Sequence, residues 1–234
     1  MKRTMIFLGL TGLISGALAI DPRLGSVSPP GVQAGTEVEM RFSGSRLEDA
    51  QEILFYKKGF EVLKIEEKTA TAVRVRVKVS ADCPLGEHPV RVRTAGGITE
   101  LKTFYVGPFP VVSRVKPKDG EPPQKLPLNC TIASSVPNES QEIYTVDAKK
   151  GQRLSAEIES MRLGRGFYDP YIEILDTKGF ILSRSDDTKL FIQDCYASAV
   201  VPEDGTYTIK VRETSYGSIG LYRMHVGTFA RPTA

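Results

Sequence analysis

One stretch of strict alternation between apolar and charged residues constrains the fold of this chain more than any other feature. Residues 73–79 read Val-Arg-Val-Arg-Val-Lys-Val, so every second side chain is apolar. A period of two places all four valines on one face of an extended strand, whereas a helix would spread them around its axis. Similar alternation recurs at 38–42, 154–159 and 207–212. The sequence therefore predicts an all-β chain built of half-buried strands.

Glycine and proline turns divide the predicted strands into two blocks. Turn residues separate short strands within residues 20–112 and again within residues 125–228. Six of the 15 prolines lie in or next to the segment between the blocks, and proline supplies no N–H to a sheet. We therefore expect two antiparallel β-sandwich domains, joined by a stiff proline-rich linker over 113–124 and followed by a C-terminal tail over 229–234.

The N-terminal residues 1–19 have the three regions of a secretory signal peptide. Lys2 and Arg3 are basic, the next residues are almost wholly apolar or small, and Ala17-Leu18-Ala19 fits a cleavage site. The alternative is a membrane anchor, but the apolar run is shorter than the roughly 20 residues that a spanning helix needs. We expect cleavage after Ala19, secretion to an extracellular or periplasmic location, and no integral membrane span afterwards.

Composition argues against two large classes of function. Hydrophobic residues make up 41% and charged residues 25% of the 234 residues, which is a globular composition. The 31 basic and 28 acidic side chains leave a formal net charge of +3, which is too small to suggest a nucleic-acid-binding surface. Two histidines and three cysteines complete a four-ligand zinc site only if nearly all of them converge. A binding or scaffolding protein is favoured over a metalloenzyme.

The three cysteines allow two interpretations. Export to an oxidising compartment would permit disulfides, and Cys130 and Cys195 lie in the same predicted domain, whereas Cys83 lies in the other. A Cys130–Cys195 bridge is one prediction. The other is that all three are buried free thiols, which behave as small apolar side chains.

Catalytic motifs do not stand out. A nucleophilic triad needs Ser or Cys, His and a carboxylate in contact, and the only histidines, His88 and His225, fall near predicted turns and strand surfaces, where we expect them to be exposed. The chain contains neither Gly-x-Ser-x-Gly nor His-Glu-x-x-His. We predict no catalytic residue and no enzymatic activity.

A cluster of aspartates in the second block offers a candidate metal site. Asp186, Asp187 and Asp194 follow a predicted strand closely, and Asp169 precedes another. Calcium takes six to eight oxygen ligands, which sandwich loops can supply. The favoured alternative is a structural turn, in which backbone N–H groups of residues 188–190 bond the carboxylates of Asp186 and Asp187. We therefore expect no cofactor, with calcium as the alternative.

The first block resembles immunoglobulin-like modules of the IPT/TIG kind. The resemblance rests on the Pro-x-Gly-containing entry at 27–36, on Phe-Ser-Gly with a following Leu at 42–47, and on the closing hairpin at 84–97. These motifs are structural turns and cover most of residues 25–106. The resemblance implies an immunoglobulin-like sandwich over residues 20–112.

The second block is similar to the bacterial pre-peptidase C-terminal (PPC) domain. The elements of that family occur in order at 144–154, 168–176, 185–187, 201–207 and 220–222. The resemblance implies a jelly-roll-like sandwich that accompanies catalytic domains and serves in substrate or matrix binding, with no catalytic residue of its own.

Together these features lead to one hypothesis and one alternative. The hypothesis is a secreted non-catalytic binding protein whose partner is an unidentified extracellular polymer or protein, such as a polysaccharide, matrix or substrate. The alternative is an accessory region of a secreted peptidase whose catalytic domain lies outside this chain. A search for a peptidase domain encoded downstream of residue 234 would distinguish them.

Overall fold

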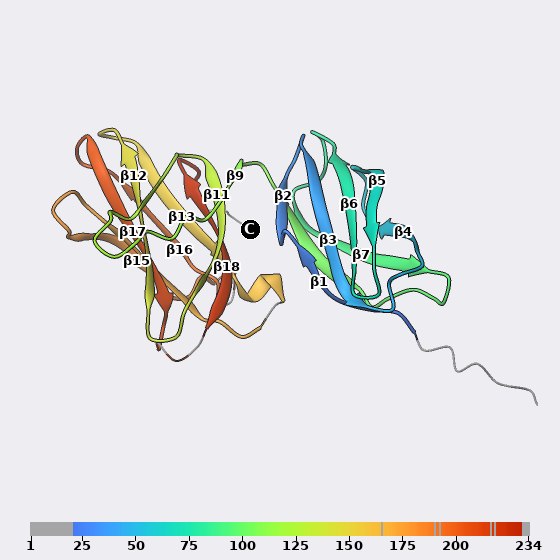
Figure 1. Ribbon diagram of the computed structural model, residues 1–234. Helices are drawn as coiled ribbons and strands as arrows, with labels where there is room; N and C mark the ends of the chain where they lie inside the picture. Colours follow the sequence, from blue (N-terminus) through green and yellow to red (C-terminus); the bar gives the residue numbers. More distant parts are fainter. Residues whose placement is uncertain are drawn as a thin grey trace, which may run out of the picture.

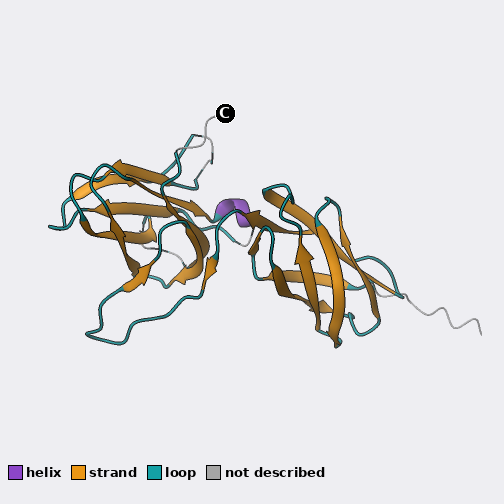
Figure 2. Cartoon of the chain, turned by 90° about the horizontal axis from the view of Figure 1, so that it is seen from above, coloured by secondary structure: helices purple, strands orange, loops and turns teal. Residues whose placement is uncertain are grey.

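The computed structural model describes residues 21–230 except residues 165, 190, 192, 216 and 218. The predicted signal peptide, residues 1–19, lies outside the described residues. Two β-sandwiches lie side by side, each around its own core, and a single 3-10 turn, η1 (Met161–Leu163), lies between them (Figures 1 and 2). This confirms the all-β prediction of two sandwiches. In the part of the chain described here, no helix has the length and apolar character needed to cross a membrane.

The first sandwich contains two four-stranded sheets. In spatial order, one sheet consists of β1 (Arg23–Ser28), β3 (Glu37–Ser45), β6 (Ala72–Val79) and β5 (Phe60–Lys68). The other consists of β2 (Gly31–Gln33), β8 (Lys102–Gly107), β7 (Gly86–Thr94) and β4 (Ala50–Phe55).

The second sandwich contains two five-stranded sheets. One consists of β10 (Gln124–Leu126), β12 (Gln141–Ala148), β17 (Gly205–Glu213), β14 (Pro170–Leu175) and β15 (Ile181–Ser185). The other consists of β16 (Tyr196–Val200), β13 (Arg153–Glu159), β18 (Gly220–Gly227), β11 (Cys130–Val136) and β9 (Val111–Val112).

The alternating stretch forms β6, a central strand of the first sandwich. Its four valines are at most 1% exposed and pack in the core. The arginines between them point outward, where Arg74 pairs with Glu67 and Arg76 with Glu66 across the β5–β6 ladder. The sequence period therefore maps directly onto a buried face and a solvated face.

The sequence predicts antiparallel strand pairs, but some pairs in the structure are parallel. Pro29 and Pro30 supply no N–H to a ladder, and the chain leaves one sheet after β1 and enters the other as β2. There β2 pairs with β8 in parallel. Two further short pairs, β9 with β11 and β10 with β12, are also parallel. Each of these parallel pairs adds a short strand at the edge of a sheet.

The chain crosses between the sandwiches earlier than predicted. The crossing lies at Pro108–Pro110, because Val111 and Val112 already form β9 on the second sandwich. The segment assigned to a linker, 113–124, is also held there. Nε of Arg114 donates to Oε2 of Glu142 at 2.7 Å. A proline-rich composition identified a segment without regular strands, but it could not show that side chains attach this segment to one domain.

This attachment predicts the outcome of limited proteolysis. Lys118 is exposed, so trypsin should cut after it first. The two fragments should remain associated in gel filtration under native conditions, because β9 stays bound to β11 through its backbone and Arg114 stays bound to Glu142. Denaturing electrophoresis of the same peak should show both fragments. Separate elution of the fragments, or a first cut within 36–106, would contradict this description.

Candidate functional site

Neither histidine is exposed, contrary to the prediction. His88 and His225 are 1% and 8% exposed. His88 Nε2 lies 2.6 Å from the carbonyl oxygen of Pro84 and 4.0 Å from Sγ of Cys83. Because a carbonyl only accepts, this nitrogen carries the proton and cannot take one from the thiol. Burial also lowers the pKa of His88 and raises the pKa of Cys83, so this Cys–His pair is not an activated nucleophile.

The predicted Cys130–Cys195 disulfide is wrong, because all three cysteines are free and buried. Cys130 begins β11 and Cys195 directly precedes β16, and both β13 and β18 lie between these strands. Three strand spacings amount to roughly 14 Å, far beyond the about 7 Å that a disulfide allows between Cα atoms. Burial raises the pKa of Cys130 to about 11 and holds the pKa of Cys195 well above its usual value. Both are small neutral core side chains.

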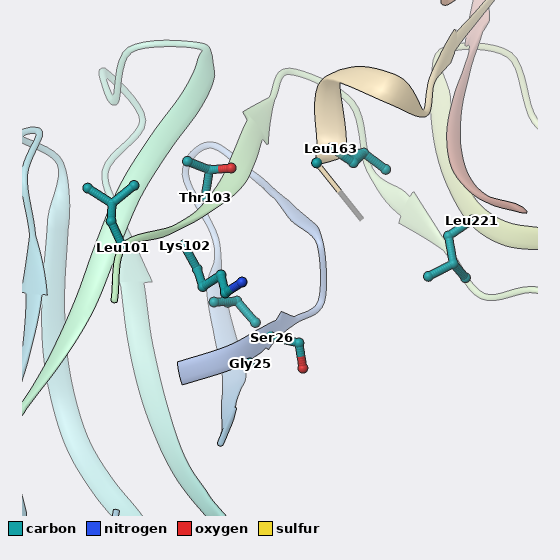
Figure 3. A pocket seen from close by; sticks show the side chains of 9 residues that line it. Gly25, Ser26, Leu101, Lys102, Thr103, Leu163 and Leu221 are labelled. Carbon is teal, nitrogen blue, oxygen red and sulfur yellow. The ribbon is translucent and has the colours of Figure 1, made fainter. Parts of the chain in front are cut away.

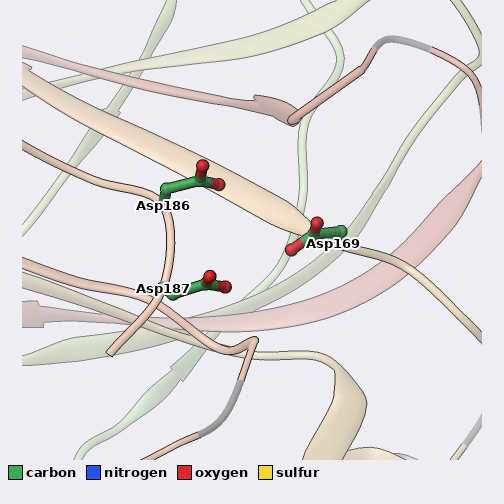
Figure 4. A group of neighbouring side chains, drawn as sticks. All are labelled: Asp169, Asp186 and Asp187. Atoms are coloured by element: carbon green, nitrogen blue, oxygen red, sulfur yellow. The ribbon is translucent and has the colours of Figure 1, made fainter. Parts of the chain in front are cut away.

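Three carboxylates meet at one end of the second sandwich (Figure 4). Asp169 directly precedes β14, whereas Asp186 and Asp187 directly follow β15, and the antiparallel pairing of these strands brings the two ends together. One oxygen of each carboxylate lies within 4.8 Å of the others. Burial, together with the charges of Asp186, Asp187 and Glu213, raises the pKa of Asp169 to about 6.

The hydrogen-bond partners of these aspartates differ from those expected for the predicted turn. Oδ1 of Asp186 accepts a hydrogen bond from the hydroxyl of Thr214 at 2.6 Å. Within the described residues, neither Thr188 nor Lys189 donates a backbone hydrogen bond to Asp186 or Asp187. Three carboxylates would supply only part of the six to eight oxygens that calcium takes. The expectation of no cofactor, with calcium as the alternative, stays a prediction.

Asp194, the third residue assigned to the candidate metal site, lies elsewhere and is fully buried. Its Oδ1 accepts from the backbone N–H groups of Ser160 at 2.9 Å and Met161 at 2.7 Å. Its Oδ2 accepts from Nε of Arg162 at 2.6 Å. The carboxylate therefore holds the start of η1 in place, and its assignment as a metal ligand is corrected to this structural role.

The two sandwiches meet at a polar interface, which we call the domain interface. The hydroxyl of Tyr105 on β8 donates to the carbonyl of Arg162 in η1 at 2.6 Å. From β18, the guanidinium of Arg223 reaches the first sandwich, where a Cβ at Gly31 would overlap its Cζ. Gly31 therefore leaves the space that this guanidinium fills. Arg223 also lies over the ring of Tyr105, with 5.8 Å between Cζ and the ring centroid.

Behind this contact lies a buried set of charged groups. Nη1 of Arg223 donates to Oε2 of Glu159 at 2.5 Å, and Nε2 of His225 lies 3.3 Å from the other carboxylate oxygen. Nδ1 of His225 is 2.7 Å from the hydroxyl of Thr131. Burial alone would raise the pKa of Glu159, but the bond with His225 and the charge of Arg223 outweigh it and lower the pKa to about 2.

A crevice of about 570 Å³ opens beside the domain interface. The first sandwich contributes Leu85, Gly86, Val106 and Gly107, the crossing contributes Pro108 and Phe109, and the second sandwich contributes Glu157, Glu159, Arg162, Phe191, His225, Phe229 and Ala230. Its walls combine apolar side chains with two carboxylates and a guanidinium. Pockets at domain interfaces with mostly apolar walls and a few polar groups are typical ligand sites.

The aromatic rings and polar groups of the crevice are held by specific contacts. The rings of Phe109 and Phe229 are 5.6 Å apart between centroids. The guanidinium of Arg162 lies 4.1 Å over the ring of Phe191, and its Nη2 donates to Oε1 of Glu157 at 2.9 Å. These contacts fix the side chains before any ligand arrives, which lowers the entropic cost of binding.

A second hollow, of about 590 Å³, also lies between the sandwiches (Figure 3). Leu101, Lys102 and Thr103 of the first sandwich face Leu163 and Leu221 of the second across it. No aromatic ring of the described chain lines this hollow, and Lys102 is its single charged residue. It offers fewer groups for recognition than the crevice, so we take the crevice as the candidate site.

No single motif of the sequence predicts the crevice. The alternation at 154–159 places Glu157 and Glu159 only on the polar side of a strand. Pairing of β13 with β18 places Glu159 opposite Arg223 and Glu157 opposite His225. The opposite charges and the matching periods of these two strands are a signal that could have suggested their pairing.

Comparisons with known proteins found one matching family model and several solved structures of low similarity. A family model of domain III of the alpha subunit of quinohemoprotein amine dehydrogenase matches residues 21–103, which is less than half of the chain. The IPT/TIG resemblance of this region is therefore not confirmed. No curated protein matches the chain.

Several solved structures share the β-sandwich architecture at low identity. PliG of Aeromonas hydrophila, a periplasmic inhibitor of g-type lysozyme, is 17% identical over 44% of this chain and 95% of its own, with a TM-score of 0.35. The pre-peptidase C-terminal domain of Bacillus anthracis collagenase is 15% identical over 47% of this chain and 99% of its own, also at 0.35. SGBP-B from the mixed-linkage glucan utilization locus of Bacteroides ovatus is 11% identical over 89% of this chain and 75% of its own, with a TM-score of 0.32. These likenesses concern the fold alone.

Proposed function

We propose that this protein is a secreted, non-catalytic binding protein that holds part of an extracellular polymer or protein in the crevice at its domain interface. The observation that carries this proposal is the convergence of Phe109, Phe191 and Phe229 from three separate segments into a crevice with walls from both sandwiches. Neither sandwich forms this site alone. The Cys83–His88 pair lacks the thiolate that nucleophilic chemistry would require, which supports binding rather than catalysis.

Retention on immobilised polymers tests this proposal. The mature protein, residues 20–234, would be passed over insoluble polysaccharides, collagen and cell envelope. Phe109→Ala should weaken retention at least tenfold, because a buried aromatic anchor contributes about 2 kcal/mol or more to binding. Phe180→Ala is the matched control, since Phe180 is 69% exposed and does not line the crevice. Circular dichroism would confirm that both variants are folded.

Two outcomes would overturn the proposal. One is that none of the polymers retains the wild-type protein. The other is that Phe109→Ala and Phe180→Ala are retained as strongly as the wild type.

A further inference from the structure

We infer that the ligand of the crevice is a neutral carbohydrate chain, of which a few sugar rings lie on the phenylalanines. This inference rests on the proposed function and specifies its ligand. The crevice must satisfy three requirements of such a ligand: aromatic faces, adjoining hydrogen-bond donors and acceptors, and compensated charge.

The aromatic faces are present at suitable places. Phe109 and Phe229 lie 5.6 Å apart with an interplanar angle of 33°, so they form a tilted pair on one wall. The face of an aromatic ring is the negative side of its quadrupole, and the C–H groups of a sugar ring are weakly positive. Stacking of a sugar ring therefore provides attraction as well as apolar burial.

Glu157 and Arg162 supply an acceptor beside a donor. Oε1 of Glu157 is bonded to Nη2 of Arg162. Nε of Arg162 is bonded to Asp194. Among the described residues, Oε2 of Glu157 and Nη1 of Arg162 have no hydrogen-bond partner. A hydroxyl both donates and accepts, so two neighbouring sugar hydroxyls match this pair. The two side chains are only 12% and 26% exposed, which strengthens hydrogen bonds made there.

The charges of the crevice favour a neutral ligand over an acidic one. Arg162 is paired with Glu157 and Asp194, and Arg223 with Glu159. The three carboxylates outnumber the two guanidiniums, so a strongly acidic polymer would find no uncompensated positive charge. A neutral polyhydroxylated chain can form hydrogen bonds with these polar groups and needs no uncompensated charge.

The strands that line the crevice disfavour an extended peptide. A peptide that adds to a sheet needs a strand with a free edge. The crevice residues Val106 and Gly107 belong to β8, which lies between β2 and β7, and Glu157 and Glu159 belong to β13, which lies between β16 and β18. Both strands are internal, so neither offers a free edge to which a peptide strand could add.

Calorimetric titration of the mature protein tests the inference. The probes are soluble neutral oligosaccharides (β-glucan, xylan and starch fragments), an acidic oligogalacturonate and gelatin peptides. We expect one neutral series to bind, with an affinity that changes less than twofold between about 50 and 500 mM salt, because a neutral ligand is not subject to ionic screening. Glu157→Gln, which replaces the free acceptor by a donor, should weaken binding about tenfold, whereas Glu61→Gln on the far strand β5 should not.

The outcomes separate this inference from the proposed function. Binding of only the acidic or peptide probe, lost in Phe109→Ala, would overturn the carbohydrate inference and leave the crevice as the binding site. Carbohydrate binding that is the same in wild type, Phe109→Ala and Glu157→Gln would overturn both. Absence of binding by every neutral oligosaccharide would overturn the carbohydrate inference, and the retention experiment would then decide the proposed function.

Discussion

Replacing Glu159 by alanine should lower the free energy of unfolding by about 3–5 kcal/mol, the usual cost of leaving one partner of a buried ion pair alone. Arg223 is only 2% exposed, so it cannot turn to water when Glu159 is removed. One of its nitrogens, Nη2, already lacks a hydrogen bond among the described residues. The remaining charge would therefore stay buried against Gly31 and Tyr105, or the domain interface would have to open.

Urea unfolding followed by circular dichroism measures this effect, with the two sandwiches fitted as separate transitions if they appear. Glu67→Ala is the matched control, because its ion pair with Arg74 is 41% exposed on both sides and such pairs contribute at most about 1 kcal/mol. The double variant Glu159→Leu with Arg223→Met should recover most of the lost stability, since it leaves no buried charge. Equal effects of Glu159→Ala and Glu67→Ala would contradict the buried-pair description.

The same carboxylate predicts how stability changes in acid. The pKa of Glu159 is lowered from its usual 4.5 to about 2, so the folded protein binds this proton less readily than the unfolded chain. The contribution of ionised Glu159 to the free energy of unfolding is therefore complete above about pH 4.5 and is lost as the pH falls from there towards 2. Glu159→Ala should show a weaker acid dependence in this window than the wild type.

Alternation along the strands indicated which face of each strand is buried, but not what covers the other face. In β13 the apolar residues Leu154, Ala156 and Ile158 point into the core, as the sequence predicted. The opposite face, with Glu157 and Glu159, looked like a solvated surface. This face lies instead at the domain interface and the crevice, because Tyr105 and Arg223 join the two domains beside it. Contacts between domains depend on their mutual orientation, which leaves no periodic trace in either sequence.

Strand order is the other property that the local pattern did not contain. Asp169 and Asp186 come together because β14 and β15 form a hairpin of short range, so turn signals in the sequence sufficed to bring them near each other. Cys130 and Cys195 belong to one sheet but not to neighbouring strands. Their separation depends on the long-range order of β11, β18, β13 and β16. Membership of the same domain was therefore a poor guide to which cysteines could form a disulfide.

Asp169→Asn should stabilise the second sandwich at pH 7 by about 1–2 kcal/mol. The pKa of Asp169 is raised from its usual 3.8 to about 6 by burial and by Asp186, Asp187 and Glu213. A raised pKa in a carboxyl means that folding favours its neutral form, so its favourable contribution is complete below about pH 3.8 and is lost as the pH rises towards 6. A shift of two pKa units corresponds to about 3 kcal/mol, which solvent screening of this half-buried group reduces.

Thermal unfolding in EDTA at pH 4 and pH 7 tests this prediction, with Asp49→Asn at an exposed site of the first sandwich as the control. The gain from Asp169→Asn should appear at pH 7 and vanish at pH 4, where the wild-type carboxyl is protonated in the folded state. Because asparagine is neutral at both values, a gain of equal size at pH 4 would show that charge is not its cause. A loss of stability at pH 7 would contradict the repulsion among these carboxylates. If calcium raises the melting temperature of the wild type and Asp169→Asn abolishes that rise, the three aspartates bind the ion, because a ligand that binds only the folded state stabilises it by mass action.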